Sequence, residues 1–122
     1  MSQTIPIACP PDLQGPGSPI RVLGIQRGDG MVVIDLAGEI RLDCSERLYP
    51  CILKCQEESS ASAVVLDFGR IQFVDSQGLA LLFMLFKALR ERQCTLAVRH
   101  ASPHVSSLLE MTRLVDYIQL IP

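Results

Sequence analysis

The sequence predicts an α/β fold: a single domain with a mixed sheet of four to five strands, helices packed on that sheet, and an N-terminal hairpin. Short runs rich in Val, Ile and Leu alternate along the chain with segments of helical spacing, which is typical of this class. The first two runs are separated by a turn sequence containing Gly-Asp-Gly, which favours a hairpin. The length of 122 residues, with 48% hydrophobic and 20% charged side chains, suits one packed core.

The folded domain is predicted to begin after an N-terminal arm. Residues 1–19 contain five of the eight prolines and two glycines among polar residues, a composition typical of a flexible arm. Ile5, Ile7 and Leu13 are the side chains able to hold part of this arm against the domain or against a second copy of the chain. We therefore assign residues 20–122 to the domain.

Five segments have the composition of strands. Residues 21–26 and 31–38 form the predicted hairpin, and residues 62–69 are a β-branched run typical of a central strand buried on both faces. "IQFV" continues from that strand as a brief extended stretch. "CTLAVRH", residues 94–100, is the next strand, and residues 116–121 end the chain as a short strand or an extended tail.

The first predicted helix occupies residues 42–59. Asp43 or Ser45 is placed to cap its start. Pro50 is unfavourable inside a helix because it lacks an N–H donor, so we expect either a start near Glu46 or a kink. Its apolar face would contain Leu48, Cys51, Ile52 and Cys55.

Two further helices are predicted, over residues 76–92 and after residue 102. Ser102 is a suitable N-cap, and Pro103 would occupy the first helical position, where proline is favoured. The resulting element order is strand, strand, helix, strand, helix, strand, helix, with a last strand at the C-terminus.

The cysteines are expected to be reduced. An odd count of five leaves at least one without a disulfide partner, and the spacing of Cys44, Cys51 and Cys55 places them on one helix face as small core side chains. Neither His100 nor His104 lies near a Cys-x-x-Cys pair, so we expect no metal site and no cofactor.

Composition and charge argue against several classes of function. The net charge of −2 and the absence of a Lys/Arg block argue against nucleic-acid binding. No apolar run approaches the length of a membrane span, and the N-terminus does not resemble a signal peptide, so we expect no membrane insertion and a cytoplasmic location. Phosphate-binding loops and nucleophile motifs are lacking, and Asp67 and Asp75 are expected to end a strand and precede a helix. We therefore expect the protein not to be an enzyme.

The helix over residues 76–92 carries two apolar stripes. One contains Leu79, Leu82, Phe83 and Phe86, with Leu89 at its edge, and the other contains Leu81, Met84, Leu85 and Ala88. One stripe is enough to dock the helix on a sheet. The second is covered either by flanking helices or by a partner protein, and its Met84 is of a type common at adaptable interfaces.

The entry of this helix is the second clue to function. Asp75 and Ser76 are candidates to cap the free N–H groups, and Gly78 would let a partner's backbone approach closely. A phosphate added to a hydroxyl at this position would expel a partner from an apolar interface, so this place suits regulation.

Three stretches within about residues 21–120 carry a family resemblance: "VVIDLAGEI", "VVLDFGRIQFVDSQGL" and the late "LLEMTRL". Through these stretches the sequence resembles the STAS domain family, the fold of bacterial anti-sigma-factor antagonists. The resemblance implies a protein of transcription regulation and signal transduction that binds an anti-sigma factor with serine-kinase activity. The kinase would phosphorylate the second hydroxyl of Asp-Ser-Ser/Thr-Gly, and a phosphatase would reverse this.

Two positions depart from that family pattern. The acceptor position is Gln77, which has no hydroxyl, so we expect either an antagonist that is always competent to bind or a domain regulated by other means; Ser76 is the substitute acceptor. The hairpin strand ends in Gly-Glu-Ile-Arg, residues 38–41, where the family often has Gly-Glu-Leu-Asp. The expected partner-binding residues are Asp75, Ser76, Gln77, Gly78, Leu79, Leu81, Met84 and Leu85.

Two alternative functions are compatible with the sequence. The same resemblance is compatible with a STAS subunit of an ABC-type lipid transporter, or with a subunit of a multi-protein signalling assembly in which the N-terminal arm makes contacts. A homodimer is also compatible with the sequence.

Overall fold

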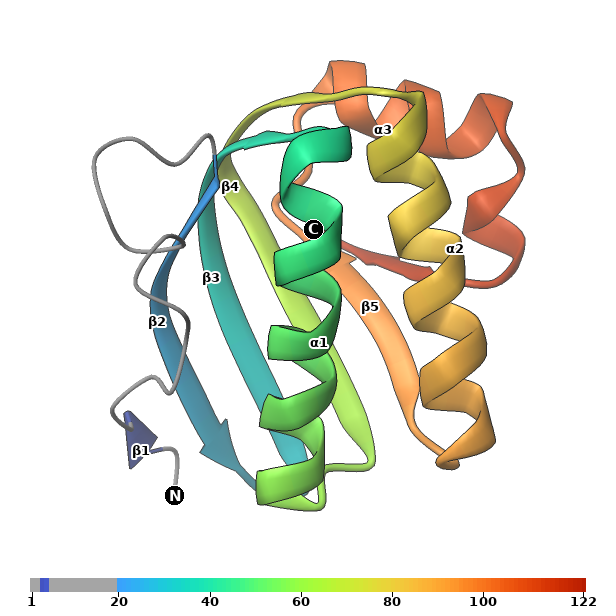
Figure 1. The fold of residues 1–122 in the computed structure, drawn as a ribbon. Coiled ribbons are helices and arrows are strands. Elements are labelled where there is room, and N and C mark those ends of the chain that lie inside the picture. The colour runs from blue at the N-terminus through green and yellow to red at the C-terminus, as the bar shows by residue number, and fades with distance from the viewer. Residues whose placement is uncertain (1–2, 5–19) are drawn as a thin grey trace.

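The computed structural model describes residues 3–4 and 20–122, and for residues 42–46 it describes the backbone alone (Figure 1). The predicted flexible arm therefore lies outside the described residues, apart from Gln3 and Thr4. The elements follow the predicted order, with one added short strand in the arm. They are β1 (Gln3–Thr4), β2 (Ile20–Gly28), β3 (Met31–Ile40), α1 (Leu42–Ser59), β4 (Ala63–Val74), α2 (Ser76–Glu91), β5 (Thr95–Arg99), α3 (Pro103–Met111), η2 (Leu114–Asp116) and β6 (Gln119–Ile121).

The six strands form one mixed sheet in the order β1-β2-β3-β4-β5-β6. β2 and β3 are antiparallel, and the neighbouring pairs β3 with β4, β4 with β5 and β5 with β6 are parallel. The turn between β2 and β3 contains Asp29 and Gly30, both with positive φ of 56° and 75°, as a two-residue hairpin turn requires. The predicted hairpin is confirmed.

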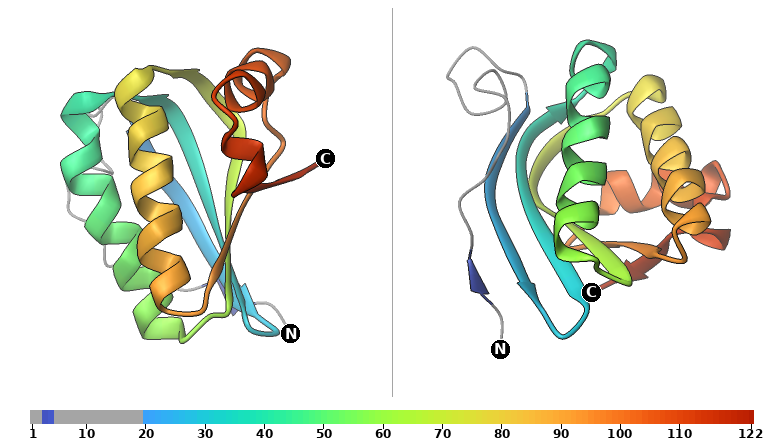
Figure 2. Two further views of the ribbon diagram at one scale, coloured as in Figure 1. Left: turned by 90° about the vertical axis from the view of Figure 1, so that its right-hand side faces the viewer. Right: turned by 60° about the horizontal axis from the view of Figure 1, so that its bottom comes forward.

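The helices lie in a defined arrangement around the sheet. α1 and α2 run side by side across one face of it, and both begin at the end where the parallel strands finish (Figures 1 and 2). α3 lies at that same end, after β5. In α3 the side chain of Ser102 accepts a hydrogen bond from the Val105 N–H at 3.2 Å, so the predicted cap with Pro103 next to it is confirmed.

The core lies between α1, α2 and the sheet. Alternate residues of the central strands point into it, and Val64, Leu66 and Phe68 of β4 are almost fully buried. Val65 and Asp67 on the opposite face of β4 are buried as well, which confirms a central strand buried on both faces. β4 continues without interruption to Val74, so the central strand and the extended stretch expected after it are a single strand.

α1 covers the segment that the sequence predicts, residues 42–59. It begins at Leu42 and contains Pro50 in its interior, so the alternative of a start near Glu46 is wrong. Asp43 and Ser45 consequently lie within the first turn and do not precede the helix. A proline removes one helical N–H donor, and the burial of Leu48, Cys51 and Ile52 against the core offsets that loss.

The cysteine side chains that the structure describes are free thiols. Cys51 is buried, and Cys55 is partly buried against the core, as expected for small apolar side chains. The hydrogen bond with Cys51, together with burial, raises the pKa of the Cys55 thiol, so this group is protonated at neutral pH. The side chain of Cys44 lies outside the description.

Candidate partner-binding site at the start of α2

The start of α2 is tied to the ends of the two central strands. Asp75 follows β4 directly and is the N-cap: its Oδ1 accepts a hydrogen bond from the Gly78 N–H at 2.8 Å. The Asp75 N–H donates to the carbonyl oxygen of Ile40, the last residue of β3, at 3.2 Å. These two bonds satisfy polar groups that would otherwise lack partners at the strand end and in the first helical turn.

Gly78 serves the packing of the chain itself. It is buried, and a Cβ atom at this position would lie 2.6 Å from the Ile40 oxygen and 2.8 Å from Cγ1 of Val74. The expectation that Gly78 leaves room for a partner's backbone is therefore wrong, because Ile40 and Val74 already occupy that space. A glycine is required here because the first turn of α2 lies directly on the end of β3.

Ser76 and Gln77 are the exposed residues of this entry. They are the first two residues of α2, and both side chains face solvent. The structure assigns the cap to Asp75, so the alternative of Ser76 as the capping residue is wrong.

Three further residues lie where β3 and β4 end, next to the start of α2 in the chain or in the strand register, and were not included in the sequence-based site. Phe73, next to the end of β4, is 40% exposed, and it lies opposite Glu39 in the register of β3 and β4. Glu39 in turn forms an ion pair with Arg41, with Nε and Oε1 3.5 Å apart. The unusual Gly-Glu-Ile-Arg ending of β3 was the available signal, but only the strand register places it beside Phe73.

The buried face of α2 does not match either predicted stripe. The buried apolar side chains are Leu81, Leu82, Leu85 and Leu89, which come from both stripes. Leu81 and Leu85 are only 2% and 0% exposed, so the expectation that they contact a partner is wrong. Met84 is 52% exposed and Leu79 is partly buried, and both remain available at the surface.

The other candidate polar residues lie apart from this entry. Asp67 is joined to Arg99 and His100: its carboxylate accepts hydrogen bonds from Arg99 Nε and from the Gly69 N–H, both at 2.9 Å, and His100 Nδ1 lies 3.2 Å away. Burial alone would raise the pKa of Asp67, but the hydrogen bonds from Gly69, Arg99 and His100 outweigh burial and lower it. Within the described residues, no group of three or more His, Cys, Asp or Glu side chains has the arrangement of a metal site.

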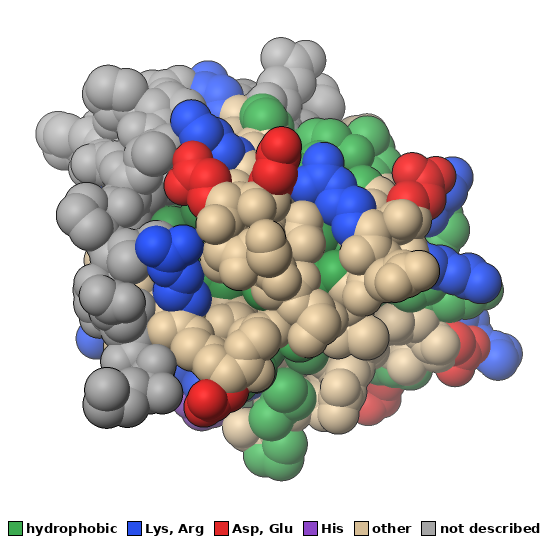
Figure 3. Space-filling model, turned by 90° about the horizontal axis from the view of Figure 1, so that it is seen from below, with side chains coloured by type: hydrophobic (Ala, Val, Ile, Leu, Met, Phe, Trp, Pro, Cys, Tyr) green, Lys and Arg blue, Asp and Glu red, His purple; other side chains and the backbone are tan. Residues whose placement is uncertain are grey.

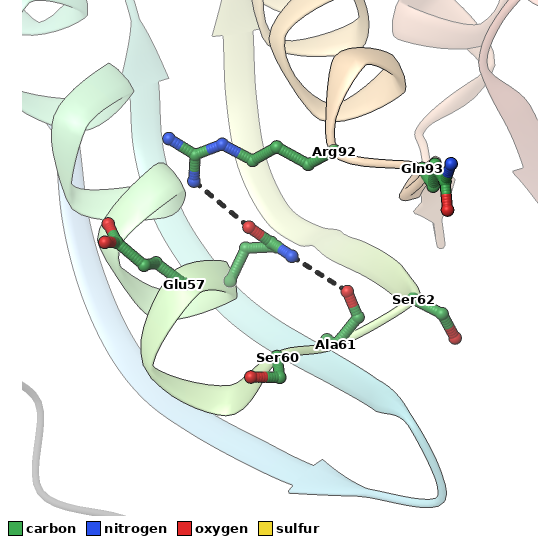
Figure 4. A pocket seen from close by; sticks show the side chains of 7 residues that line it. Glu57, Ser60, Ala61, Ser62, Arg92 and Gln93 are labelled. Carbon is green, nitrogen blue, oxygen red and sulfur yellow. Dashed lines mark hydrogen bonds between the residues drawn. The ribbon is translucent and has the colours of Figure 1, made fainter.

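A polar pocket of about 610 Å³ lies at the opposite end of α2 (Figure 4). Figure 3 shows this end of the molecule, where polar side chains and backbone are surrounded by charges of both signs. The buried Gln56 donates from Nε2 to the Ala61 oxygen at 2.9 Å, and its Oε1 accepts from Arg92 Nη1 at 3.1 Å. Arg92 Nη1 also donates to the Leu53 oxygen at 3.1 Å. These bonds join the end of α1 to the loop before β4 and to the residue that follows α2, which is a structural role.

Comparison with known proteins identifies the family. The family model described as "Mlab, STAS domain" matches residues 23–122, and the chain belongs to the STAS domain family. None of the helices in the described parts of the chain has the length and apolarity that a membrane crossing requires.

Similar proteins indicate which type of STAS domain this chain is. The chain is 31% identical over 90 residues to BtrV of Bordetella bronchiseptica, which carries the name of an anti-sigma factor antagonist; the match covers 74% of this chain and 77% of that protein. It is 26% identical to the anti-sigma F factor antagonist of Paenibacillus polymyxa, over 70% of this chain and 73% of the relative. The crystal structure of an anti-sigma factor antagonist from Mycobacterium paratuberculosis superposes with a TM-score of 0.73 and 26% identity, covering 90% and 91% of the two chains. This protein is thus a STAS domain of the anti-sigma factor antagonist type.

Proposed function

We propose that this protein binds an anti-sigma factor of the serine-kinase type through residues 75–78 and the exposed side of α2, and catalyses no reaction of its own. The observation that carries the proposal is the position of Gln77. Its side chain is exposed in the first turn of α2, within the sequence Asp-Ser-Gln-Gly, on the fold of an antagonist. The hydrogen bond from the Gly78 N–H to the Asp75 side chain fixes this turn, so Ser76 and Gln77 lie on a rigid element.

The replacement of the phosphoacceptor by Gln77 sets the regulatory state. An amide side chain has no hydroxyl and cannot accept a phosphoryl group in kinase chemistry. It is also neutral, so it imitates an unmodified hydroxyl and not a phosphate of nearly two negative charges. The surface is therefore always in the form that binds, and control of this protein acts through its amount or through its partner.

Gln77→Glu tests the interface because it separates folding from binding. A negative charge in the first turn of a helix is favourable by about 0.3–1 kcal/mol, so the variant is expected to fold at least as well as the wild type. At an interface the same charge must lose its water, and we expect affinity for the anti-sigma factor to fall at least tenfold. Calorimetric titration against each purified anti-sigma factor of the source organism measures this.

The matched control is Gln93→Glu, the same chemical change at the opposite end of α2, where Gln93 is exposed and borders the polar pocket. It should bind as the wild type does. Equal affinities of Gln77→Glu and the wild type would remove the start of α2 from the interface. Binding to a transport ATPase, with no affinity for any anti-sigma factor, would favour the transporter alternative.

A kinase assay tests the regulatory part of the proposal. The wild type incubated with the anti-sigma factor and ATP is expected to carry no phosphate in residues 75–78 when mapped by mass spectrometry, whereas Gln77→Ser should be phosphorylated at residue 77. Stoichiometric phosphate on Ser76 of the wild type would show that the switch has moved by one residue, and it would overturn the proposal of a surface that is always competent.

A further inference from the structure

The exposed apolar side chains of the described residues are concentrated on one side of the protein. Among the large apolar side chains of the described residues, eight are exposed, and five of these lie on α2 and on the segment from α3 to Tyr117, the residue after η2. The five are Phe83, Met84, Met111, Val115 and Tyr117. Scattered single apolar residues are normal at a surface, but a concentration on adjacent elements indicates an interaction surface.

Three aromatic rings at the centre of this region contact one another. The ring centroids of Phe83 and Tyr117 are 5.9 Å apart in an edge-to-face arrangement, and those of Phe86 and Tyr117 are 5.2 Å apart. Phe83 and Phe86 lie one helical turn apart, with centroids separated by 6.2 Å. Phe83 is 39% exposed and Tyr117 is 52% exposed although each is held by the others. Rings already fixed in place lose little conformational freedom when a partner covers them, so such a cluster favours binding.

The charge next to these rings is positive. Lys87 Nζ lies 5.7 Å from the centroid of the Phe83 ring. Within the described residues, neither Lys87 nor Arg90 forms an ion pair, whereas Arg113 pairs with Asp116 at 3.0 Å. At 100° per residue, Lys87 and Arg90 lie within about 40° of Phe83 around the helix, and Glu91 lies about 80° away. A carboxylate of a partner that covers the rings would therefore lie near the positive charges of Lys87 and Arg90.

The region is continuous with the proposed binding site. Ser76, Ala80, Phe83 and Lys87 are all exposed and follow one another at spacings of four, three and four residues. They therefore form one line along the outer side of α2, about 16 Å long at 1.5 Å per residue. A partner lying on Ser76 and Gln77 and following α2 would reach the aromatic rings without leaving the protein surface.

We infer that the anti-sigma factor recognised at the start of α2 also covers the aromatic ridge, defined as Phe83, Phe86, Lys87 and Tyr117. The partner surface that fits this ridge has an apolar side chain against the rings of Phe83 and Tyr117 and a carboxylate beside Lys87. This inference depends on the proposed function, because the partner is the same protein. It adds a second contact region, and it predicts acidic and apolar chemistry on the partner.

Two variants test the ridge by calorimetric titration against the anti-sigma factor that binds the wild type. Phe83→Ser removes the central ring, and Lys87→Glu reverses the charge without removing any buried atom. We expect each to weaken binding at least tenfold. Raising the salt concentration should weaken the binding of the wild type, whereas it should leave Lys87→Glu unchanged or improve its binding, because screening acts on opposite signs of interaction.

The controls are matched in exposure and charge. Leu23 on β2 is 39% exposed, as Phe83 is, and Leu23→Ser should bind as the wild type does. Lys54→Glu makes the same charge reversal on α1, where the Nζ atom of Lys54 lies 3.9 Å from Oε1 of Glu58. Circular dichroism and thermal unfolding establish the folded fraction of every variant, and Lys87→Glu keeps the test decisive if Phe83→Ser loses stability.

The outcomes separate the two proposals. If Gln77→Glu abolishes binding while Phe83→Ser and Lys87→Glu bind as the wild type does, the ridge is not part of the interface, and the proposed function stands with its interface confined to the start of α2. If the wild type binds no anti-sigma factor of its source organism, both proposals are wrong.

Discussion

Gly78 of α2 lies against the carbonyl oxygen of Ile40 so closely that a Cβ atom at residue 78 would be 2.6 Å from that oxygen. The same oxygen accepts the hydrogen bond of the Asp75 N–H. The end of β3 and the start of α2 are thus a single packed joint, and Ser76 and Gln77 are carried on its outer side.

This contact makes Gly78→Ala a destabilising change. The neighbouring atoms are backbone and buried side chain, so they cannot move aside at low cost, and we expect a loss of about 1–3 kcal/mol in the free energy of unfolding. Urea denaturation measures it. Gly24→Ala is the control, since no atom lies within 4 Å of a Cβ atom at that position. Equal stability of the two variants would contradict the packed joint.

The Asp75 cap predicts a second stability effect. Asp75→Ala removes the acceptor of the Gly78 N–H, and we expect a loss of about 0.5–2 kcal/mol. Asp75→Asn retains an acceptor oxygen and should stay close to the wild type, because asparagine caps helices as well as aspartate does. Thermal unfolding compares the two variants. An equal loss of stability in both would contradict the prediction, because the negative charge of Asp75 and not its hydrogen bond would then stabilise the start of α2.

The buried amide of Gln56 should contribute more to stability than its exposed neighbour does. Gln56→Ala leaves the Ala61 carbonyl without its side-chain donor and removes one of the two acceptors of Arg92 Nη1, so we expect a loss of about 1–3 kcal/mol. Glu57→Ala, one residue further along α1 and exposed, should change stability by no more than about 0.5 kcal/mol. A small effect of Gln56→Ala in chemical denaturation would show that water replaces the amide in this pocket.

Asp67 gives the stability a dependence on acid pH. Its pKa in the folded protein lies below the ordinary value of 3.8, so folding favours the ionised carboxylate. The resulting stabilisation is complete well above pH 4, decreases as the pH falls below the unfolded value, and is lost once the pH passes below the folded value. The stability difference between the wild type and Asp67→Asn should therefore be largest near neutral pH and should decrease as the pH falls below the unfolded value of 3.8 and through the folded value. Urea midpoints measured across this range test it, and a difference that stays constant with pH would rule Asp67 out as the source.

The elements of the fold were largely predictable because they depend on local periodicity. The Asp29–Gly30 turn, the Ser102–Pro103 start of α3 and the buried run of β4 each follow from a few adjacent residues, and the structure confirms them. The place of Pro50 inside α1 was not predictable by the same rules, because they disfavour proline in a helix interior. The burial of its neighbours, which offsets the lost hydrogen bond, is a property of the assembled core.

The candidate site was predictable only in part. The motif Asp-Ser-Gln-Gly indicated the start of α2, and Asp75 is the cap there. Leu81 and Leu85 were predicted to face a partner, but they are buried in the core. Because α2 is hydrophobic around most of its circumference, periodicity alone does not select the buried face. That face is set by the direction in which α2 meets the sheet and α1.

Local sequence is sufficient to specify the order of the elements, the membership of the STAS family and the absence of a hydroxyl at residue 77, because each depends on residue identity or short-range spacing. Long-range packing determined the rest. It buried Gly78 on Ile40, turned Leu81 and Leu85 inward, and brought Tyr117 from the C-terminal segment onto Phe83 and Phe86. Contacts between residues more than thirty positions apart leave no periodic signal in a chain, so the surface that a partner would meet emerges only when the elements are assembled.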